Sequence, residues 1–439
     1  MSAGSLPGIL SNKVEPVLRR EKASMSEENR EYSIVIWGAS GFTGKLTAEY
    51  ILGRYGVSDH FRWALGGRNL AKLEKVRKEI SESTGVAAES LPIVVGDGDD
   101  ETFLTSLAEQ THVVCTTVGP YAKYGSKLVA ACVKAGTDYC DLTGEVQWVK
   151  RMIDAHHDEA VSNRARIVFT CGFDCIPSDI GAYFMQKSMK EKHGVPCSQI
   201  QLRVNGFSGA ASGGTVASML NMMDEAQEDS SILKTLRAPY SINPEGQQSG
   251  PDGSEAVLPS YDSQFDQWVA PFVMASVNTK VVRRSNALLD YAYGADFRYD
   301  EGVLCGRGPG GFVKATATGL GGALGMGAMA IGPIRRFAAG RLPQPGDGPS
   351  LEKREAGFFS LTLLGHHPTD PSLNLRAHVE GDRDPGYGST SKMLGESAVC
   401  LALDSLPSEG GCLTPASAMG EALLARLNQN AGVRFDLEG

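Results

Sequence analysis

The sequence predicts an α/β fold with a Rossmann-type dinucleotide-binding domain first and an α+β domain after it, built on a mostly antiparallel sheet. Three observations lead to this prediction. Glycines at 38, 41 and 44 follow an apolar strand, strands and helices alternate to about residue 180, and alternating β-branched residues appear from about Val195. At 439 residues the chain is long enough for two hydrophobic cores.

The first strand covers residues 34–37 and enters a glycine-rich turn before a helix. Gly38 allows a tight bend, Gly41 lets backbone amides approach a pyrophosphate, and Gly44 permits close packing of the helix on the strand. The phosphates would lie at the helix N-terminus, which favours negative charge. The alternative is a purely structural turn. The cofactor-binding residues predicted here are Gly38, Ala39, Ser40, Gly41, Phe42, Thr43 and Gly44.

The second strand, within residues 61–68, indicates which dinucleotide is bound. NAD enzymes usually place an acid at its end, where this chain has Gly66, Gly67 and then Arg68. A missing carboxylate with an arginine supplied suits a 2′-phosphate, so we predict NADP(H). The alternative is that Arg68 is a solvated residue at the start of the next helix.

The third and fourth strands are expected within residues 91–97 and 112–121. Asp97 ends the third strand and would contact the adenine edge, or cap the helix that begins near Glu101. Val118, Gly119 and Pro120 end the fourth strand, at the sheet edge where the cofactor is expected.

If the bound cofactor reduces a double bond, a proton donor is also needed, because the cofactor supplies only the hydride. Tyr121 is our first candidate, with Asp174 and Cys175 on the loop after the strand at 165–171. The alternative for Tyr121 is a nicotinamide-stacking or purely packed aromatic. Asp141 and Glu145 are expected to cap helices and order loops.

The second half of the chain carries strands expected at 199–204 and 269–282, and a loop at 239–262 expected to be mobile. Residues 315–334 contain no charge and are followed by Arg335, Arg336 and Arg341. We expect an interface-seeking hairpin there; the alternatives are a membrane span and a substrate lid.

The composition of the chain limits the cellular compartment and the classes of binding partner that we expect. The nine cysteines form no CxxC pair and are odd in number, so neither a disulfide framework nor a metal site is expected, and a cytoplasmic location follows. A net charge of −9 without long basic runs argues against nucleic acid. Residues 1–31 have no signal-peptide core and are expected to be a disordered tail.

Several motifs together resemble the saccharopine dehydrogenase-like oxidoreductases, a family that includes the mycobacterial trans-acting enoyl reductases. Besides the turn at 38–44 and Gly66 to Arg68, the matching motifs are those at 118–125, 139–145, 172–179, 212–215, 281–288, 342–349, 384–387 and 410–416.

The resemblance implies an NADP-dependent enzyme whose Rossmann domain is completed by the helix after Leu413. The expected division is 32–180 for the Rossmann domain, 181–390 for the inserted domain and 391–439 for the returning segment. The resemblance also implies reduction of a C=C bond in a lipid or glycolipid precursor, with membrane association among relatives. The partners expected are a small lipid-like molecule, a peripheral membrane contact and a homo-oligomer. The alternatives are a saccharopine reductase-type dehydrogenase of an amino-acid adduct and a non-catalytic NADP-binding lipid-associated protein.

Overall fold

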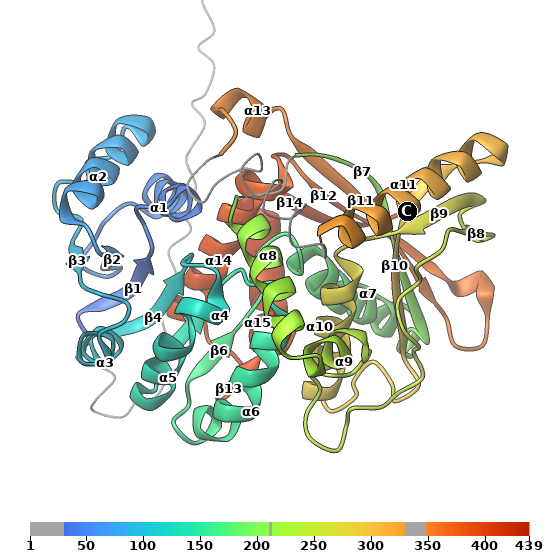
Figure 1. Cartoon of the computed structure of the whole chain (residues 1–439), viewed down its shortest axis with the longest axis horizontal. Helices are drawn as coiled ribbons and strands as arrows, with labels where there is room; N and C mark the ends of the chain where they lie inside the picture. Colours follow the sequence, from blue (N-terminus) through green and yellow to red (C-terminus); the bar gives the residue numbers. More distant parts are fainter. Residues whose placement is uncertain (1–29, 210–212, 330–347, 439) are drawn as a thin grey trace, which may run out of the picture.

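A computed structural model of the protein describes residues 30–209, 213–329 and 348–438. Two seven-stranded sheets organise this part of the chain. Figure 1 shows the first sheet on the left and the second on the right, with helices on and between them. The expected α/β fold class is confirmed, whereas the domain boundaries stay a prediction.

All neighbouring strands of the first sheet run parallel. Its strand order is β13 (Gly411–Leu413), β6 (Arg166–Val168), β5 (Asp138–Cys140), β4 (Thr111–Thr116), β1 (Tyr32–Trp37), β2 (Trp63–Gly67) and β3 (Ile93–Val95). The helices between these strands are α1 (Phe42–Tyr55), α2 (Leu70–Thr84), α3 (Glu101–Glu109), α4 (Tyr121–Tyr124), α5 (Ser126–Ala135), α6 (Val146–Ser162) and α7 (Ile176–His193).

Both faces of the first sheet are buried, as expected for a parallel sheet with helices on each side. Along β1, Ile34 and Ile36 point into one hydrophobic cluster, while Val35 and Trp37 point into another. This period of two is what a pleated strand imposes. The apolar side chains of β1 therefore pack on both faces of the first sheet.

The second sheet is mixed: β7 pairs parallel with β10, and the other pairings are antiparallel. Its order is β14 (Val433–Leu437), β12 (Leu375–Gly381), β11 (Phe358–His366), β7 (Gln199–Ser208), β10 (Arg298–Gly306), β9 (Gln267–Pro271) and β8 (Ser260–Asp262). The remaining described elements are α8 (Gly213–Glu228), α9 (Ser231–Arg237), α10 (Ala275–Leu288), α11 (Gly308–Met329), α13 (Leu351–Glu355), η1 (Pro371–Leu373), η2 (Pro385–Ser389), α14 (Thr390–Leu403), α15 (Pro415–Arg426) and η3 (Leu427–Ala431).

The C-terminal segment contributes to both sheets. Helix α14 packs against β1, β4 and β5, and β13 extends the first sheet beyond β6. The last strand, β14, instead pairs with β12 in the second sheet. The helix after Leu413, α15, contacts α7, α10 and α14. The return to the first sheet thus begins with α14 and β13, and the helix after Leu413 continues it with contacts to β6 and α7.

The strand expected at 269–282 is wrong beyond residue 271, because α10 begins at Ala275. Val277 and Val281 lie four residues apart and pack together in one cluster, and Val282 packs in the other. β-branched residues lower helix propensity only slightly. Burial on two sides of the helix outweighs that local preference.

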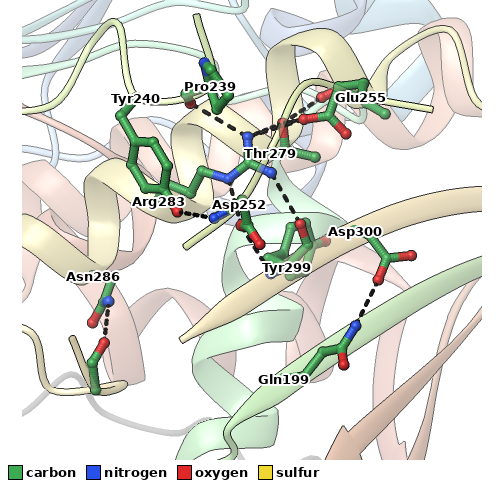
Figure 2. Close-up of polar contacts among 12 residues, drawn as sticks. Gln199, Pro239, Tyr240, Asp252, Glu255, Thr279, Arg283, Asn286, Tyr299 and Asp300 are labelled. Atoms are coloured by element: carbon green, nitrogen blue, oxygen red, sulfur yellow. Dashed lines mark hydrogen bonds and ion pairs between the residues drawn. The ribbon is translucent and has the colours of Figure 1, made fainter. Parts of the chain in front are cut away.

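The loop at 239–262 is held in place, contrary to the expected mobility. Arg283 of α10 forms ion pairs with Asp252 at 2.8 Å and Glu255 at 3.0 Å, and its guanidinium lies 5.4 Å from the Tyr240 ring centre. The Tyr240 hydroxyl accepts the Asp252 amide at 3.0 Å. Figure 2 shows these groups converging on Arg283. A single buried arginine therefore orders a segment whose composition suggests a free loop.

Residues 315–329 of the uncharged segment belong to α11, which packs against β9 and β10. Residues 330–334 and the three following arginines lie outside the described residues. None of the helices in the described ranges has both the length and the apolar character of a membrane span.

Candidate functional site

The glycine-rich turn has the conformation that its sequence predicts. Gly38 has a φ of +92°, and a Cβ on Gly44 would lie 2.3 Å from the Gly38 carbonyl oxygen. Only glycine fits these two positions without a backbone shift. A Cβ on Gly41 would lie 3.3 Å from the same oxygen, and Gly41 is exposed. Gly38 and Gly44 therefore shape the turn, and Gly41 keeps its outer side open.

The first turn of α1 offers the amides that a pyrophosphate needs. Gly41 is the N-cap and provides no side-chain cap, and no acidic residue lies in the first turn. The first backbone hydrogen bond within α1 runs from the Lys45 amide to the Gly41 carbonyl. The amides of Phe42, Thr43 and Gly44 precede it, so they have no carbonyl partner one turn earlier in the helix. The residues present thus fit a dinucleotide.

Arg68 and Ser40 lie at the edge expected for the 2′-phosphate. Arg68 is exposed, and no ion pair or hydrogen bond of its side chain occurs among the described residues. The next helix is capped by Asn69, whose side chain accepts the Lys72 amide at 3.0 Å. A Cβ on Gly67 would lie 3.7 Å from the Ser40 hydroxyl oxygen. Ser40, Gly67 and Arg68 are therefore neighbours, and the guanidinium is available.

Asp97 is exposed at the end of β3 and accepts the Asp99 amide at 3.1 Å. Helix α3 is capped by Asp100, which accepts the amides of Thr102 and Phe103. Asp97 therefore does not cap the helix, and its contact with adenine stays a prediction.

The end of β4 lies directly against the turn. The Thr117 hydroxyl donates to the Gly38 carbonyl at 3.3 Å, and a Cβ on Gly38 would lie 2.6 Å from a Val118 methyl carbon. The Gly119–Pro120 peptide that follows is cis. The structure thus brings Val118 to Pro120 beside the glycines, as the crevice of a parallel sheet requires.

Tyr121 is enclosed beneath that edge. Its hydroxyl donates to the Thr116 carbonyl at 3.3 Å, and its ring stacks on Trp148 with centroids 5.6 Å apart. Burial, followed by the nearby Asp141 carboxylate, raises its pKa well above the usual value. This is the geometry of the alternative interpretation, a packed aromatic. Because the Tyr121 hydroxyl already donates its proton to a buried carbonyl group, it is poorly placed to donate a proton to a substrate in the crevice.

Asp141 and Glu145 order loops, as expected. Asp141 accepts the amides of Thr143 and Thr170, each at 3.0 Å, and burial raises its pKa to about 7. The Glu145 carboxylate accepts the amides of Tyr121 at 2.7 Å and Ala122 at 3.0 Å, so it caps the first turn of α4 from a distant loop.

Asp174 differs from the other buried or half-buried acids of this region. It is half-buried on the loop after β6, and no hydrogen bond to its carboxylate occurs among the described residues. Burial raises its pKa to about 6. The adjacent Cys175 is fully buried, with its thiol 3.4 Å from the Asn278 side-chain oxygen, and burial raises its pKa well above the usual value. Of the two residues, Asp174 therefore has the side chain that could exchange a proton with a substrate, whereas the Cys175 side chain is enclosed in the core.

Sequence reasoning missed a group of residues from outside the first sheet that converge on Phe42. The ring of Tyr387 lies 4.8 Å from that of Phe42, and the Arg354 guanidinium lies 5.6 Å from the Phe42 ring centre. The Tyr387 hydroxyl accepts the Gly213 amide of α8 at 3.1 Å. The motif at 384–387 was the available signal, but it shows no distance to residue 42.

Helix α8 is tied to the first sheet as well. The Ser218 hydroxyl donates to Glu145 at 2.7 Å, and Glu225 pairs with Arg151 of α6 at 2.9 Å. A Cβ on Gly119 would lie 3.7 Å from the Ser218 hydroxyl oxygen. This helix, green near the centre of Figure 1, therefore passes beside the end of β4.

Comparisons with known proteins agree with this geometry. A family model described as saccharopine dehydrogenase NADP binding domain matches residues 34–168. A Mycobacterium tuberculosis homologue is 40% identical over 416 residues, which are 92% of this chain and 97% of the homologue. The trans-acting enoyl reductase of Mycobacterium ulcerans is 38% identical over 421 residues, 93% of this chain and 98% of that protein.

Among solved structures, apo saccharopine dehydrogenase (L-Glu forming) from Saccharomyces cerevisiae aligns with 92% of this chain and 99% of its own, at 11% identity and a TM-score of 0.46. The family model and the homologues show an oxidoreductase whose first sheet is an NADP-binding unit. The chain belongs to the saccharopine dehydrogenase-like oxidoreductases, in the group of the trans-acting enoyl reductases.

Proposed function

We propose that the protein reduces a carbon–carbon double bond conjugated to a carbonyl group, with NADPH as reductant and a lipid-like acyl chain as substrate. The observation that carries the proposal is Asp174, a half-buried carboxyl group without a hydrogen-bond partner among the described residues. The relatives named trans-acting enoyl reductase, at 38% identity over most of the chain, support the reaction class.

NADPH, when bound, supplies a hydride to one carbon of the double bond. The electron pair then moves toward the carbonyl group, and the second carbon needs a proton. Asp174 would provide it, because its pKa of about 6 leaves about a tenth of the groups protonated at pH 7. The turn at 38–44 and Arg68 would hold the cofactor, while the enclosed Tyr121 keeps the end of β4 in place.

An apolar stripe on α8 supports a lipid-like substrate. Val216, Met219, Leu220 and Met223 follow helical spacing on one side, away from Ser218 and Glu225. Val216 is buried and the other three are half-buried, yet none of the four belongs to the hydrophobic clusters of the described core. Methionine and leucine at the edge of a cofactor crevice suit a flexible acyl chain.

A peripheral membrane contact would deliver such a substrate. Leu258, Val273 and Leu320 are 74%, 65% and 56% exposed, respectively. A Cβ on Gly319 would lie 3.3 Å from Pro271 and 3.9 Å from Pro259, so the three chain segments that carry these exposed residues come together. We call them, with Leu324, the apolar patch. An exposed group of this kind suits an interface. Self-association stays a prediction.

The test is reduction of trans-2-enoyl thioesters of 4 to 16 carbons, followed by NADPH oxidation. We expect turnover that improves with chain length, and Asp174→Asn should abolish it while leaving NADPH binding unchanged. Asn has nearly the same shape and cannot deliver the proton, and the same substitution at the exposed Asp158 of α6 is the control. Oxidation of saccharopine with NADP⁺ in place of enoyl reduction would favour the amino-acid reaction. NADPH binding without turnover of either would favour a non-catalytic protein.

A further inference from the structure

Arg354 is placed beside the cofactor turn by a segment far from it in sequence. It is the penultimate residue of α13, and its guanidinium lies 5.6 Å from the centre of the Phe42 ring. Phe42 is the first residue of α1, where the amides for the pyrophosphate begin. A cation held at this helix terminus therefore lies within reach of the anion expected there.

Within the described residues, the charge of Arg354 acts on the Asp384 carboxylate without forming a close ion pair with it. No carboxylate forms an ion pair with it in those ranges, and its Nε is enclosed without a hydrogen bond. Two neighbouring cations differ, since Lys392 and Arg383 both pair with Asp382, at 3.3 Å and 3.9 Å. A half-buried guanidinium with an unsatisfied donor is unfavourable unless an anion completes it.

The ring beneath Arg354 is fixed from several sides. A Cβ on Gly348 would lie 2.2 Å from the Phe42 ring, so the backbone passes directly over it, and the Tyr387 ring lies 4.8 Å away. The Asp384 amide donates to the Arg354 carbonyl at 3.0 Å. The arginine is thus positioned before any ligand arrives, which lowers the entropy lost on binding.

We propose that Arg354 is a cofactor-binding residue that contacts the pyrophosphate of NADP(H). Arg68 lies at the end of β2, where the 2′-phosphate is expected, whereas Phe42 marks the first turn of α1, where the pyrophosphate is expected. The two arginines would therefore bind different phosphates of the cofactor, Arg68 the 2′-phosphate and Arg354 the pyrophosphate. Because the pyrophosphate is common to NADPH, NADH and ADP-ribose, loss of Arg354 weakens all three alike.

Arg354 also borders a hollow of about 370 Å³ on the outer face of α1, together with Leu46, Tyr50 and Lys392. If the guanidinium served an anion in this hollow instead, the affinity for the dinucleotides would not depend on it. Arg383 lines the same hollow but is paired with Asp382, which makes it the matched control.

The experiment compares Arg354→Gln and Arg383→Gln with the wild type, using the dissociation constants of NADPH, NADH and ADP-ribose and the thermal unfolding of the free protein. Arg354→Gln should weaken all three ligands by the same factor, about tenfold or more. Arg383→Gln should change none of them. Weakening of NADPH alone, or unchanged affinity for all three, would overturn the proposal.

If Arg354→Gln does not fold, chemical modification of the wild-type protein tests the same proposal. Inorganic pyrophosphate should protect Arg354 from modification by phenylglyoxal, measured on its peptide by mass spectrometry, while Arg383 reacts as before. Equal modification of Arg354 with and without pyrophosphate would contradict the assignment.

Discussion

Gly41 and Gly44 are three residues apart in the same turn, and the structure predicts opposite effects for the same substitution. A Cβ on Gly44 would lie 2.3 Å from the Gly38 carbonyl oxygen and 2.8 Å from the Thr117 hydroxyl oxygen, about 1 Å inside ordinary contact. Gly44→Ala should therefore lower the free energy of unfolding by about 1–3 kcal/mol. A Cβ on Gly41 lies 3.3 Å from the same carbonyl, with φ −78° and ψ 164°, which alanine adopts freely.

Gly41→Ala should leave the free protein as stable as the wild type, or stabilise it by about 0.4–1 kcal/mol through the unfolded chain. Its methyl group would occupy the space beside the amides of α1. Loss of a charge-assisted hydrogen bond there costs about 1.5–3 kcal/mol, or one to two orders of magnitude in NADPH affinity. Thermal unfolding of the free protein and a fluorescence titration with NADPH measure the two effects separately. The reasoning is refuted if Gly41→Ala unfolds as easily as Gly44→Ala, or binds NADPH as the wild type does.

Three further predictions concern the cofactor, the donor and the surface. Arg68→Ala should weaken NADPH by one to two orders of magnitude, about 1.5–3 kcal/mol, and leave NADH unchanged; equal affinity of the wild type for both cofactors would contradict the NADP assignment. Because burial raises the pKa of Asp174 to about 6, the protonated fraction falls as pH rises, so kcat should drop about tenfold between pH 7 and pH 8. A flat profile over this range would exclude Asp174 as the donor. The protein should sediment with anionic liposomes at low salt and be released at high salt, because arginines such as Arg335, Arg336 and Arg341 each contribute about 1 kcal/mol when they lie near an anionic bilayer. Leu320→Glu should weaken this binding. If the protein sediments in neither condition, the apolar patch has no membrane role.

The cofactor turn could be predicted from the sequence because its determinants are local. Gly38 needs a positive φ and Gly44 needs room against a backbone oxygen only six residues away, so the spacing of glycines carries the information. Arg68 follows from the same logic, since it ends the neighbouring strand. These features depend on short stretches of chain and on rules for parallel sheets.

Other features depend on contacts that no local pattern contains. The direction of the Tyr121 hydroxyl is set by the Thr116 carbonyl and the Trp148 ring, and strand-end position alone cannot distinguish core from crevice. Order in the loop at 239–262 comes from Arg283, which is 31 residues from Asp252. Helix α10 was mistaken for a strand because its valines suit either element locally.

The convergence of Arg354 and Tyr387 on Phe42 joins parts of the chain more than 300 residues apart. Tyr387 lies in a motif that indicated no partner, and Arg354 lies in none of the motifs. The same holds for α8, whose Ser218 meets Glu145. Residues that the fold brings to the crevice from beyond the first sheet were therefore the ones that sequence reasoning could not place.

The most direct test of the central claim follows two hydrogens into one product. The purified protein is given a trans-2-enoyl thioester and NADPH carrying deuterium at C4 of the nicotinamide, in ordinary water, and the reverse labelling is then run in D2O. The account predicts one deuteron from the cofactor on one alkene carbon and one from solvent on the other, both absent from the product pool of Asp174→Asn. Bound NADPH with no labelled product from any chain length would contradict the claim that this crevice is a reductase site.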